Sequence, residues 1–117
     1  MEAHFELSDA AFEQAFQDST LDPTLFSHEA HLRLAWIHLN RYGYEQAMQN
    51  VCDQLQSYTQ AVGAADKYNM PLTMAATKAV HHLMSQSDTD NFSDFIEAFP
   101  QLKHDFRRTV SPYFAMR

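Results

Sequence analysis

The chain has 117 residues, a length typical of a single domain that forms its own core. Its composition, 45% hydrophobic and 13% aromatic, excludes a disordered chain, and two glycines with four prolines disfavour an all-β fold with many tight turns. The net charge of −7 argues against a nucleic-acid-binding surface, because an acidic surface repels phosphates. We expect one domain over residues 1–117 and no nucleic-acid partner.

The acidic residues are concentrated at the start of the chain. Residues 1–32 carry seven acids and no Lys or Arg, whereas eight acids balance eight bases from Arg33 onward. Cys52 is the only cysteine, so an intramolecular disulfide is excluded. No basic leader and no apolar run of membrane-spanning length is present. These features predict a cytoplasmic protein without membrane association.

The first half of the chain shows two helix starts with clear capping residues. Ser8 is a suitable N-cap for a helix over Asp9–Asp18. Ser27 is a suitable N-cap for a second helix over His28–Arg41, which Gly43 ends. On this second helix, Arg33 and Asn40 take the few positions left for solvent.

The rest of the chain is also helical in its periodicity. The strongest pattern, over Tyr44–Ala61, repeats apolar residues at i, i+3, i+4 and i+7: Tyr44, Ala47, Met48, Val51, Leu55, Tyr58, Val62. Further helices are predicted from Pro71, over Asn91–Phe99 and over Pro100–Arg108, with Ser111–Phe114 as an extended tail. The fold class is all-α: a compact, antiparallel bundle of five to six helices with short loops.

Two histidines stand three residues apart at the start of the second helix. At 100° per residue, His28 and His31 share a stripe with Ala35 and His38. Because apolar residues occupy most of the remaining surface of this helix, the stripe is expected to border the core. Such a pair is either a hydrogen-bonded structural feature or part of a binding pocket.

The same spacing could hold a metal ion only with ligands from other segments. The other histidines and acids are distant and show no recognised metal spacing: His4, His81, His82, His104. A di-iron carboxylate bundle needs two Glu-x-x-His motifs, which the sequence lacks. We therefore predict no metal site and no cofactor.

A second polar cluster spans residues 68–73. Tyr68, Asn69 and Thr73 offer several donors and acceptors near the start of the helix that Pro71 begins. Two interpretations remain open for this cluster. Its side chains either cap the helix and bond backward to its backbone, or they contact a ligand.

The segment Phe26-Ser27-His28-x-x-His31-Leu32 resembles an uncharacterised group of small all-helical bacterial proteins. That group pairs an F-[ST]-H-x-x-H-L motif with a later Y-H-x-T-[IL]-T motif. Tyr68, Leu72 and Thr73 match the second motif, but Asn69 and Pro71 replace its His and first Thr. The resemblance implies an all-α fold and one polar centre built from both motifs. The loss of a third imidazole at Asn69 further weakens a metal site.

We therefore expect an interior pocket that binds a small organic ligand. Its binding residues would be His28, His31, Trp36, Tyr68, Asn69 and Thr73. Its apolar wall would be formed by Trp36, Met48, Met70 and Met84. No catalytic residue is assigned; in an enzyme, His31 or His28 would be the acid–base group, because imidazole titrates near neutral pH.

Two alternatives stay open. The first is a protein-interaction or homodimerisation module whose contact surface is the aromatic C-terminal end: Phe92, Phe95, Phe99, Phe106, Tyr113, Phe114. The second is a folded domain in which the histidines only support a turn. A metal-dependent enzyme is less favoured than either.

Overall fold

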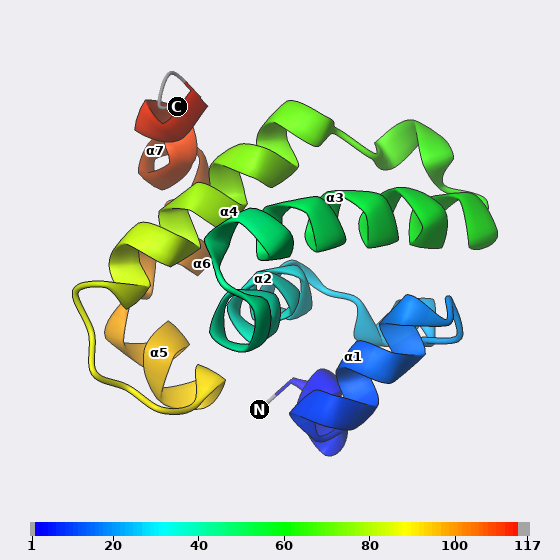
Figure 1. Cartoon of the computed structure of the whole chain (residues 1–117), viewed down its shortest axis with the longest axis horizontal. Helices are drawn as coiled ribbons and strands as arrows, with labels where there is room; N and C mark the ends of the chain where they lie inside the picture. Colours follow the sequence, from blue (N-terminus) through cyan, green and yellow to red (C-terminus); the bar gives the residue numbers. More distant parts are fainter. Residues whose placement is uncertain (1, 115–117) are drawn as a thin grey trace.

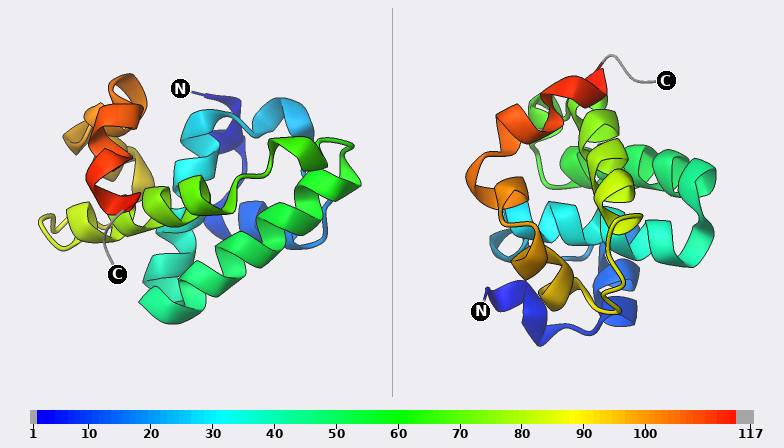
Figure 2. Two further views of the ribbon diagram at one scale, coloured as in Figure 1. Left: turned by 90° about the horizontal axis from the view of Figure 1, so that it is seen from above. Right: turned by 90° about the vertical axis from the view of Figure 1, so that its left-hand side faces the viewer.

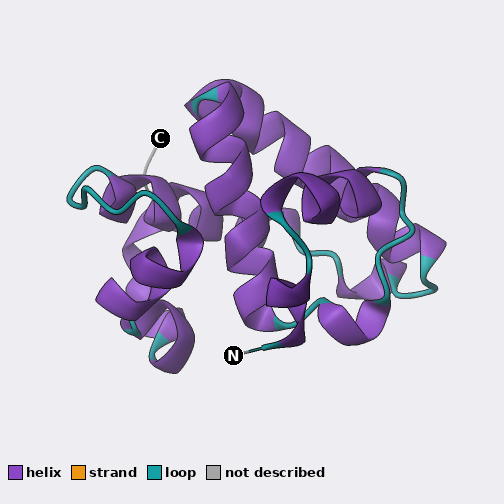
Figure 3. Cartoon of the chain, turned by 90° about the horizontal axis from the view of Figure 1, so that it is seen from below, coloured by secondary structure: helices purple, strands orange, loops and turns teal. Residues whose placement is uncertain are grey.

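The computed structural model describes residues 2–114 and is helical throughout (Figure 1). Its α-helices are α1 (Asp9–Gln17), α2 (His28–Tyr42), α3 (Tyr44–Ala61), α4 (Met70–Met84), α5 (Phe92–Ala98), α6 (Gln101–His104) and α7 (Phe106–Val110). Short 3₁₀ helices are η1 (Ala3–Glu6), η2 (Pro23–Leu25), η3 (Ala65–Lys67) and η4 (Ser111–Phe114). Residues 2–114 contain no strand, as Figure 3 shows, so the all-α fold is confirmed. None of the described helices has the length and apolar character needed to cross a lipid bilayer.

Helix α2 lies at the centre of the fold. Residues 32–39 are all buried, and α2 packs against α1, α3, α4 and α5. In Figure 1, α2 points towards the viewer while α3 and α4 lie across the view. Helix α2 therefore crosses α3 and α4 steeply, whereas α3 and α4 run in opposite directions, within the compact all-α bundle that was expected. Steep crossing lets one short helix contact four others and lose nearly all its solvent exposure.

The capping residues set most helix starts where the sequence predicts them. Ser8 accepts a hydrogen bond from the Ala11 amide and Ser27 from the Ala30 amide, both at 3.1 Å. Asn69 and Asn91 cap α4 and α5 in the same way. Because each cap satisfies an amide that lacks a partner within the helix, it stabilises the helix at a defined residue.

The C-terminal region differs from the expectation. The single helix predicted over Pro100–Arg108 is broken at Asp105 (φ −141°, ψ 46°), which separates α6 from α7. The predicted extended tail is the 3₁₀ helix η4, which with α7 packs along α4 (Figure 2). The break allows Leu102 and Val110 to reach the core, where both are fully buried. The described chain thus has seven α-helices, not five to six.

The connection between α2 and α3 consists of Gly43 alone. Gly43 adopts φ +81° and ψ 172°, a combination that is almost exclusive to glycine, and no atom lies within 4 Å of where a Cβ would stand. We expect Gly43→Ala to lower the free energy of unfolding by about 1–3 kcal/mol through backbone strain alone. Urea denaturation would measure this loss, and an unchanged stability would show that the residue does not hold a positive φ.

Candidate functional site

A pocket of about 370 Å³ opens between α2, α3, η3 and the start of α4. Most of its wall is apolar or aromatic: Pro23, Phe26, Leu55, Tyr58, Val62, Ala64, Leu72. Its polar lining consists of His31, Thr59, Lys67, Tyr68, Asn69 and Thr73. An apolar cavity with a few converging polar groups is the usual form of a small-molecule site.

Four of the six residues predicted to bind a ligand line this pocket. His31 comes from the first turn of α2, whereas Tyr68, Asn69 and Thr73 come from the start of α4, about forty residues later in the chain. The contact between α2 and α4 brings the two segments together. The two polar motifs of the sequence therefore meet at one pocket.

His31 presents a buried nitrogen to this site. Its Nε2 atom is inaccessible to solvent and has no hydrogen-bond partner among residues 2–114. The ring packs against Phe26, with 5.7 Å between centroids. Burial, and to a smaller extent the charge of His28, lower the pKa of His31 to about 4, so the imidazole is neutral at pH 7. An unpartnered buried polar atom costs about 1–3 kcal/mol, which a ligand or water in the pocket would offset.

Tyr58 and Tyr68 are both held as neutral phenols. The Tyr58 hydroxyl donates to the Leu21 carbonyl at 2.9 Å, so it ties α3 to the loop after α1. Burial, with smaller contributions from the neighbouring Cys52 and Asp53, raises the pKa of Tyr68 to about 12. Neither tyrosine is activated as a nucleophile or base at neutral pH.

Asn69 acts mainly as a cap. Its Oδ1 accepts from the Leu72 amide at 3.1 Å and its carbonyl accepts from the Thr73 amide at 2.9 Å. Since Pro71 has no amide hydrogen, the first turn of α4 has few free donors left for a ligand. The Asn69 Nδ2 and the hydroxyl of Thr73, a residue only 2% exposed, make no hydrogen bond to another described residue.

His28 lies outside the pocket, contrary to the expectation. Its Nε2–H donates to the Leu102 carbonyl at 2.9 Å, and its ring lies edge-on to Phe106, 4.4 Å between centroids. Three residues turn a helix by about 300°, so His28 and His31 diverge by about 60°. That divergence is enough for the C-terminal segment to cover His28 while His31 faces α3 and α4.

Trp36 and the three methionines predicted for the wall are also absent from the lining. Trp36 is buried on another face of α2, with its ring 6.0 Å from that of Phe92. It stands five residues after His31, which places it about 140° away around the helix. Aromatic and branched side chains from α3 and α4 take the places expected for Met48, Met70 and Met84.

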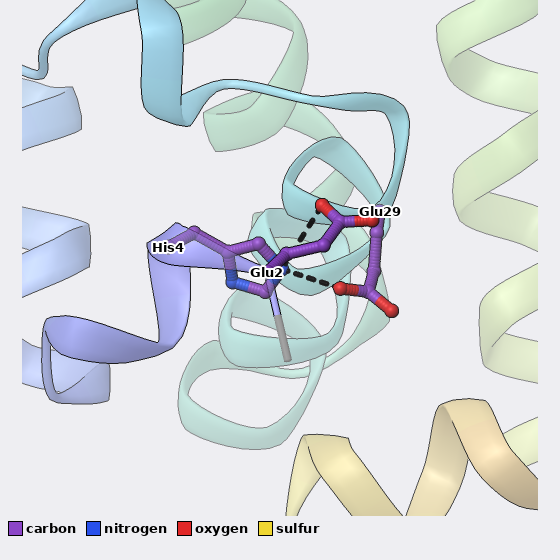
Figure 4. A group of neighbouring side chains, drawn as sticks. All are labelled: Glu2, His4 and Glu29. Atoms are coloured by element: carbon purple, nitrogen blue, oxygen red, sulfur yellow. Dashed lines mark hydrogen bonds and ion pairs between the residues drawn. The ribbon is translucent and has the colours of Figure 1, made fainter.

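A second polar cluster joins the N-terminal segment to α2 through Glu2, His4 and Glu29 (Figure 4), and Lys103 adds a link to α6. His4 is fully buried, and its Nε2 lies 2.7 Å from Glu29 Oε2 and 3.7 Å from Glu2 Oε1. Lys103 Nζ lies 3.1 Å from Glu29 and 3.3 Å from Glu2. The sequence did not reveal this group, because His4 and Glu29 are 25 residues apart and share no motif.

The ligand atoms of Glu2, His4 and Glu29 lie within 4.8 Å of one another, close enough for a metal ion. The proton on His4 argues against that use. Nδ1 of His4 faces Arg33 Nη1 at 3.3 Å, and a guanidinium can only donate, so the proton of a neutral ring stands on Nε2. Nε2–H therefore donates to Glu29, and Lys103 neutralises the carboxylates. The geometry fits a partly buried network of hydrogen bonds and ion pairs, in which His4 and Glu29 are buried and Glu2 and Lys103 are about one third exposed.

No protein-family model matches the chain, and neither the curated proteins nor the solved structures include a significant match. The fold and the pocket define the protein as an all-α domain with a partly polar cavity on one side of its central helix. Its function must therefore be inferred from the site itself.

Proposed function

We propose that this protein binds a small organic molecule in the pocket of His31, Tyr68, Asn69 and Thr73. The observation that carries the proposal is the buried Nε2 atom of His31, which lines this cavity and has no hydrogen-bond partner among residues 2–114. A buried polar atom without a partner costs stability, so it favours a partner from outside the chain. Thr73 and the exposed Asn69 add polar atoms to the same lining. The cavity of about 370 Å³ falls in the range of small-molecule sites.

The site supports binding better than acid–base catalysis. A general acid or base works best when its pKa is near the working pH, whereas burial lowers the pKa of His31 to about 4. The lining contains no carboxylate to orient or charge the imidazole. His28, the other acid–base candidate, bonds a backbone carbonyl outside the cavity.

The interaction-module alternative has less support from burial. Of the six C-terminal aromatic residues that would form its contact surface, Phe114 is the one exposed side chain, at 53%, and the others are buried or half-buried in the fold.

A cytoplasmic location and kinship with the bacterial group of the two motifs remain part of the proposal. Cell fractionation would test the cytoplasmic location.

Fragment screening by NMR tests the proposal directly. We expect fragments from a library of small aromatic acids, alcohols and amides to shift the amide resonances of Leu55, Tyr68 and Thr73. His31→Leu should weaken the best fragment about two- to tenfold, the effect of one hydrogen bond.

His38→Leu is the matched control for this experiment. His38 also lies on α2 with a buried, unpartnered Nε2, but it does not line the pocket. We expect His38→Leu to bind the fragment like the wild-type protein. Fragments that shift no pocket resonance, or that bind His31→Leu with wild-type affinity, would contradict the proposal.

A further inference from the structure

The charge of the pocket lining differs from that of the chain. The protein has a net charge of −7, yet no Asp or Glu lines the pocket, and Lys67 is its one charged lining residue. Lys67 makes no ion pair with another described residue. Asp22 and Asp53, which act on the lining tyrosines, stand outside the lining. The charge carried by the lining itself is therefore positive, although the chain as a whole is acidic.

Three of the polar groups that line the pocket can donate hydrogen bonds: Lys67 Nζ, Asn69 Nδ2 and the Thr73 hydroxyl. Lys67 and Asn69 are exposed residues, and Thr73 is buried. Lys67 Nζ is a donor only. Asn69 uses its Oδ1 to cap α4, which leaves its Nδ2 as the free group of that amide. The Thr73 hydroxyl makes no hydrogen bond to another residue of the described range 2–114 and can donate. A carboxylate, which accepts hydrogen bonds and carries the opposite charge, matches these three groups.

The remainder of the pocket suits a flat apolar body. Phe26 and Tyr58 meet edge to face with 5.4 Å between centroids, and Leu55, Val62 and Leu72 complete the wall. Aromatic rings bind well against such edges and faces. His31 Nε2 is the free polar atom among these aromatic side chains. Because the hydrogen of a neutral imidazole can stand on either ring nitrogen, Nε2 can donate a hydrogen bond to a ligand hydroxyl group or accept one from it.

From these features we infer that the ligand is a small organic acid, with its carboxylate at Lys67 and Asn69 and its ring between Phe26 and Leu72. The inference rests on the proposed function and names the chemical class of its ligand. A hydroxyl group on the ring would bond His31.

Three probes of nearly equal shape test the inference: 3-(4-hydroxyphenyl)propanoate, its neutral amide, and the amine tyramine. Titration into ¹⁵N-labelled protein gives the dissociation constant of each. We expect the acid to bind about three- to tenfold more tightly than the amide, the effect of one partly exposed charge interaction. Tyramine should bind most weakly, and added salt should reduce the preference for the acid.

Two matched variants locate the charge that recognises the acid. Lys67→Gln should remove the preference for the acid over the amide. Arg107→Gln should leave it unchanged, because Arg107 lines a neighbouring hollow that shares only Asn69 and Leu72 with the pocket.

The outcomes separate the two levels of the proposal. Equal binding of acid and amide, or a preference lost in Arg107→Gln, would overturn the organic-acid inference and leave small-molecule binding intact. If none of the three probes shifts a pocket resonance while other library fragments do, the organic-acid inference fails and the proposed small-molecule binding stands. If no fragment of any class binds, the proposed function fails with it.

Discussion

Replacing Arg33 with methionine is expected to lower the free energy of unfolding by about 2–3 kcal/mol, the cost of losing the hydrogen bonds that a buried charged group donates. Arg33 was expected to face solvent, but it is only 4% exposed. Its Nη1 donates to the His4 carbonyl at 2.7 Å, and its Nη2 donates to the Leu7 carbonyl and to Asp9 at 2.8 Å each. The guanidinium thus connects the N-terminal segment to α2.

Methionine would fill much of the same volume but would donate no hydrogen bond. The Leu7 carbonyl would lose the guanidinium as donor, and the His4 carbonyl would keep only the Leu7 amide. The contacts of the guanidinium with the Phe5 and Phe12 rings, at 5.4 Å and 4.9 Å, would also be lost. We expect the N-terminal segment to detach first, and hydrogen exchange of residues 3–9 would report this detachment.

Arg108→Met is the matched control. Arg108 pairs with Asp105 at 3.7 Å, and both side chains are exposed, at 87% and 53%, so its removal should cost no more than about 1 kcal/mol. Denaturation in guanidinium chloride would measure how much free energy of unfolding each variant loses. Equal losses would show that the Arg33 network is as weak as a surface ion pair.

The second large effect is a loss of stability in acid that depends on His31. Its pKa is about 4 in the folded protein against 6.5 in the unfolded chain. Above pH 6.5 both states are neutral and the residue has no effect. As the pH falls from 6.5 to 4, the unfolded chain takes up a proton that the folded protein does not, so stability falls by about 3 kcal/mol in total.

Comparison with His31→Leu isolates this contribution, because the carboxylates that titrate at low pH are the same in both proteins. The free energy of unfolding, measured at intervals between pH 7 and pH 4, should fall about 3 kcal/mol further in the wild type than in the variant. His38, whose pKa burial also lowers, remains in both proteins and cancels. Parallel pH profiles would mean that the His31 ring is open to water.

Local signals predicted the helices well and their arrangement poorly. Ser8 and Ser27 placed their helix starts at the observed residues, because a cap acts on its own first turn. The break at Asp105 and the steep crossing of α2 with α3 depend on contacts between distant residues. Periodicity within one helix carries no information about such contacts.

The candidate site was likewise predicted in part: local signals identified some of its residues, and contacts between distant segments decided the others. Helical periodicity predicted that His31 borders the core, and the two motifs predicted that it meets Tyr68 and Thr73. Periodicity left the roles of His28 and Trp36 undetermined, because the neighbours of each face of α2 come from α5, α6 and α7. The burial of Arg33 and His4 required knowledge of how the N-terminal segment folds back.

Native mass spectrometry of the untagged protein, purified without chelator, tests the central claim most directly. Binding in the His31 pocket predicts a noncovalent adduct with the mass of a small organic molecule, present in the wild type and in His38→Leu and lost or reduced in His31→Leu. A bare protein mass in all three, or an adduct that is equally abundant in His31→Leu, would contradict the claim that this pocket is a ligand site.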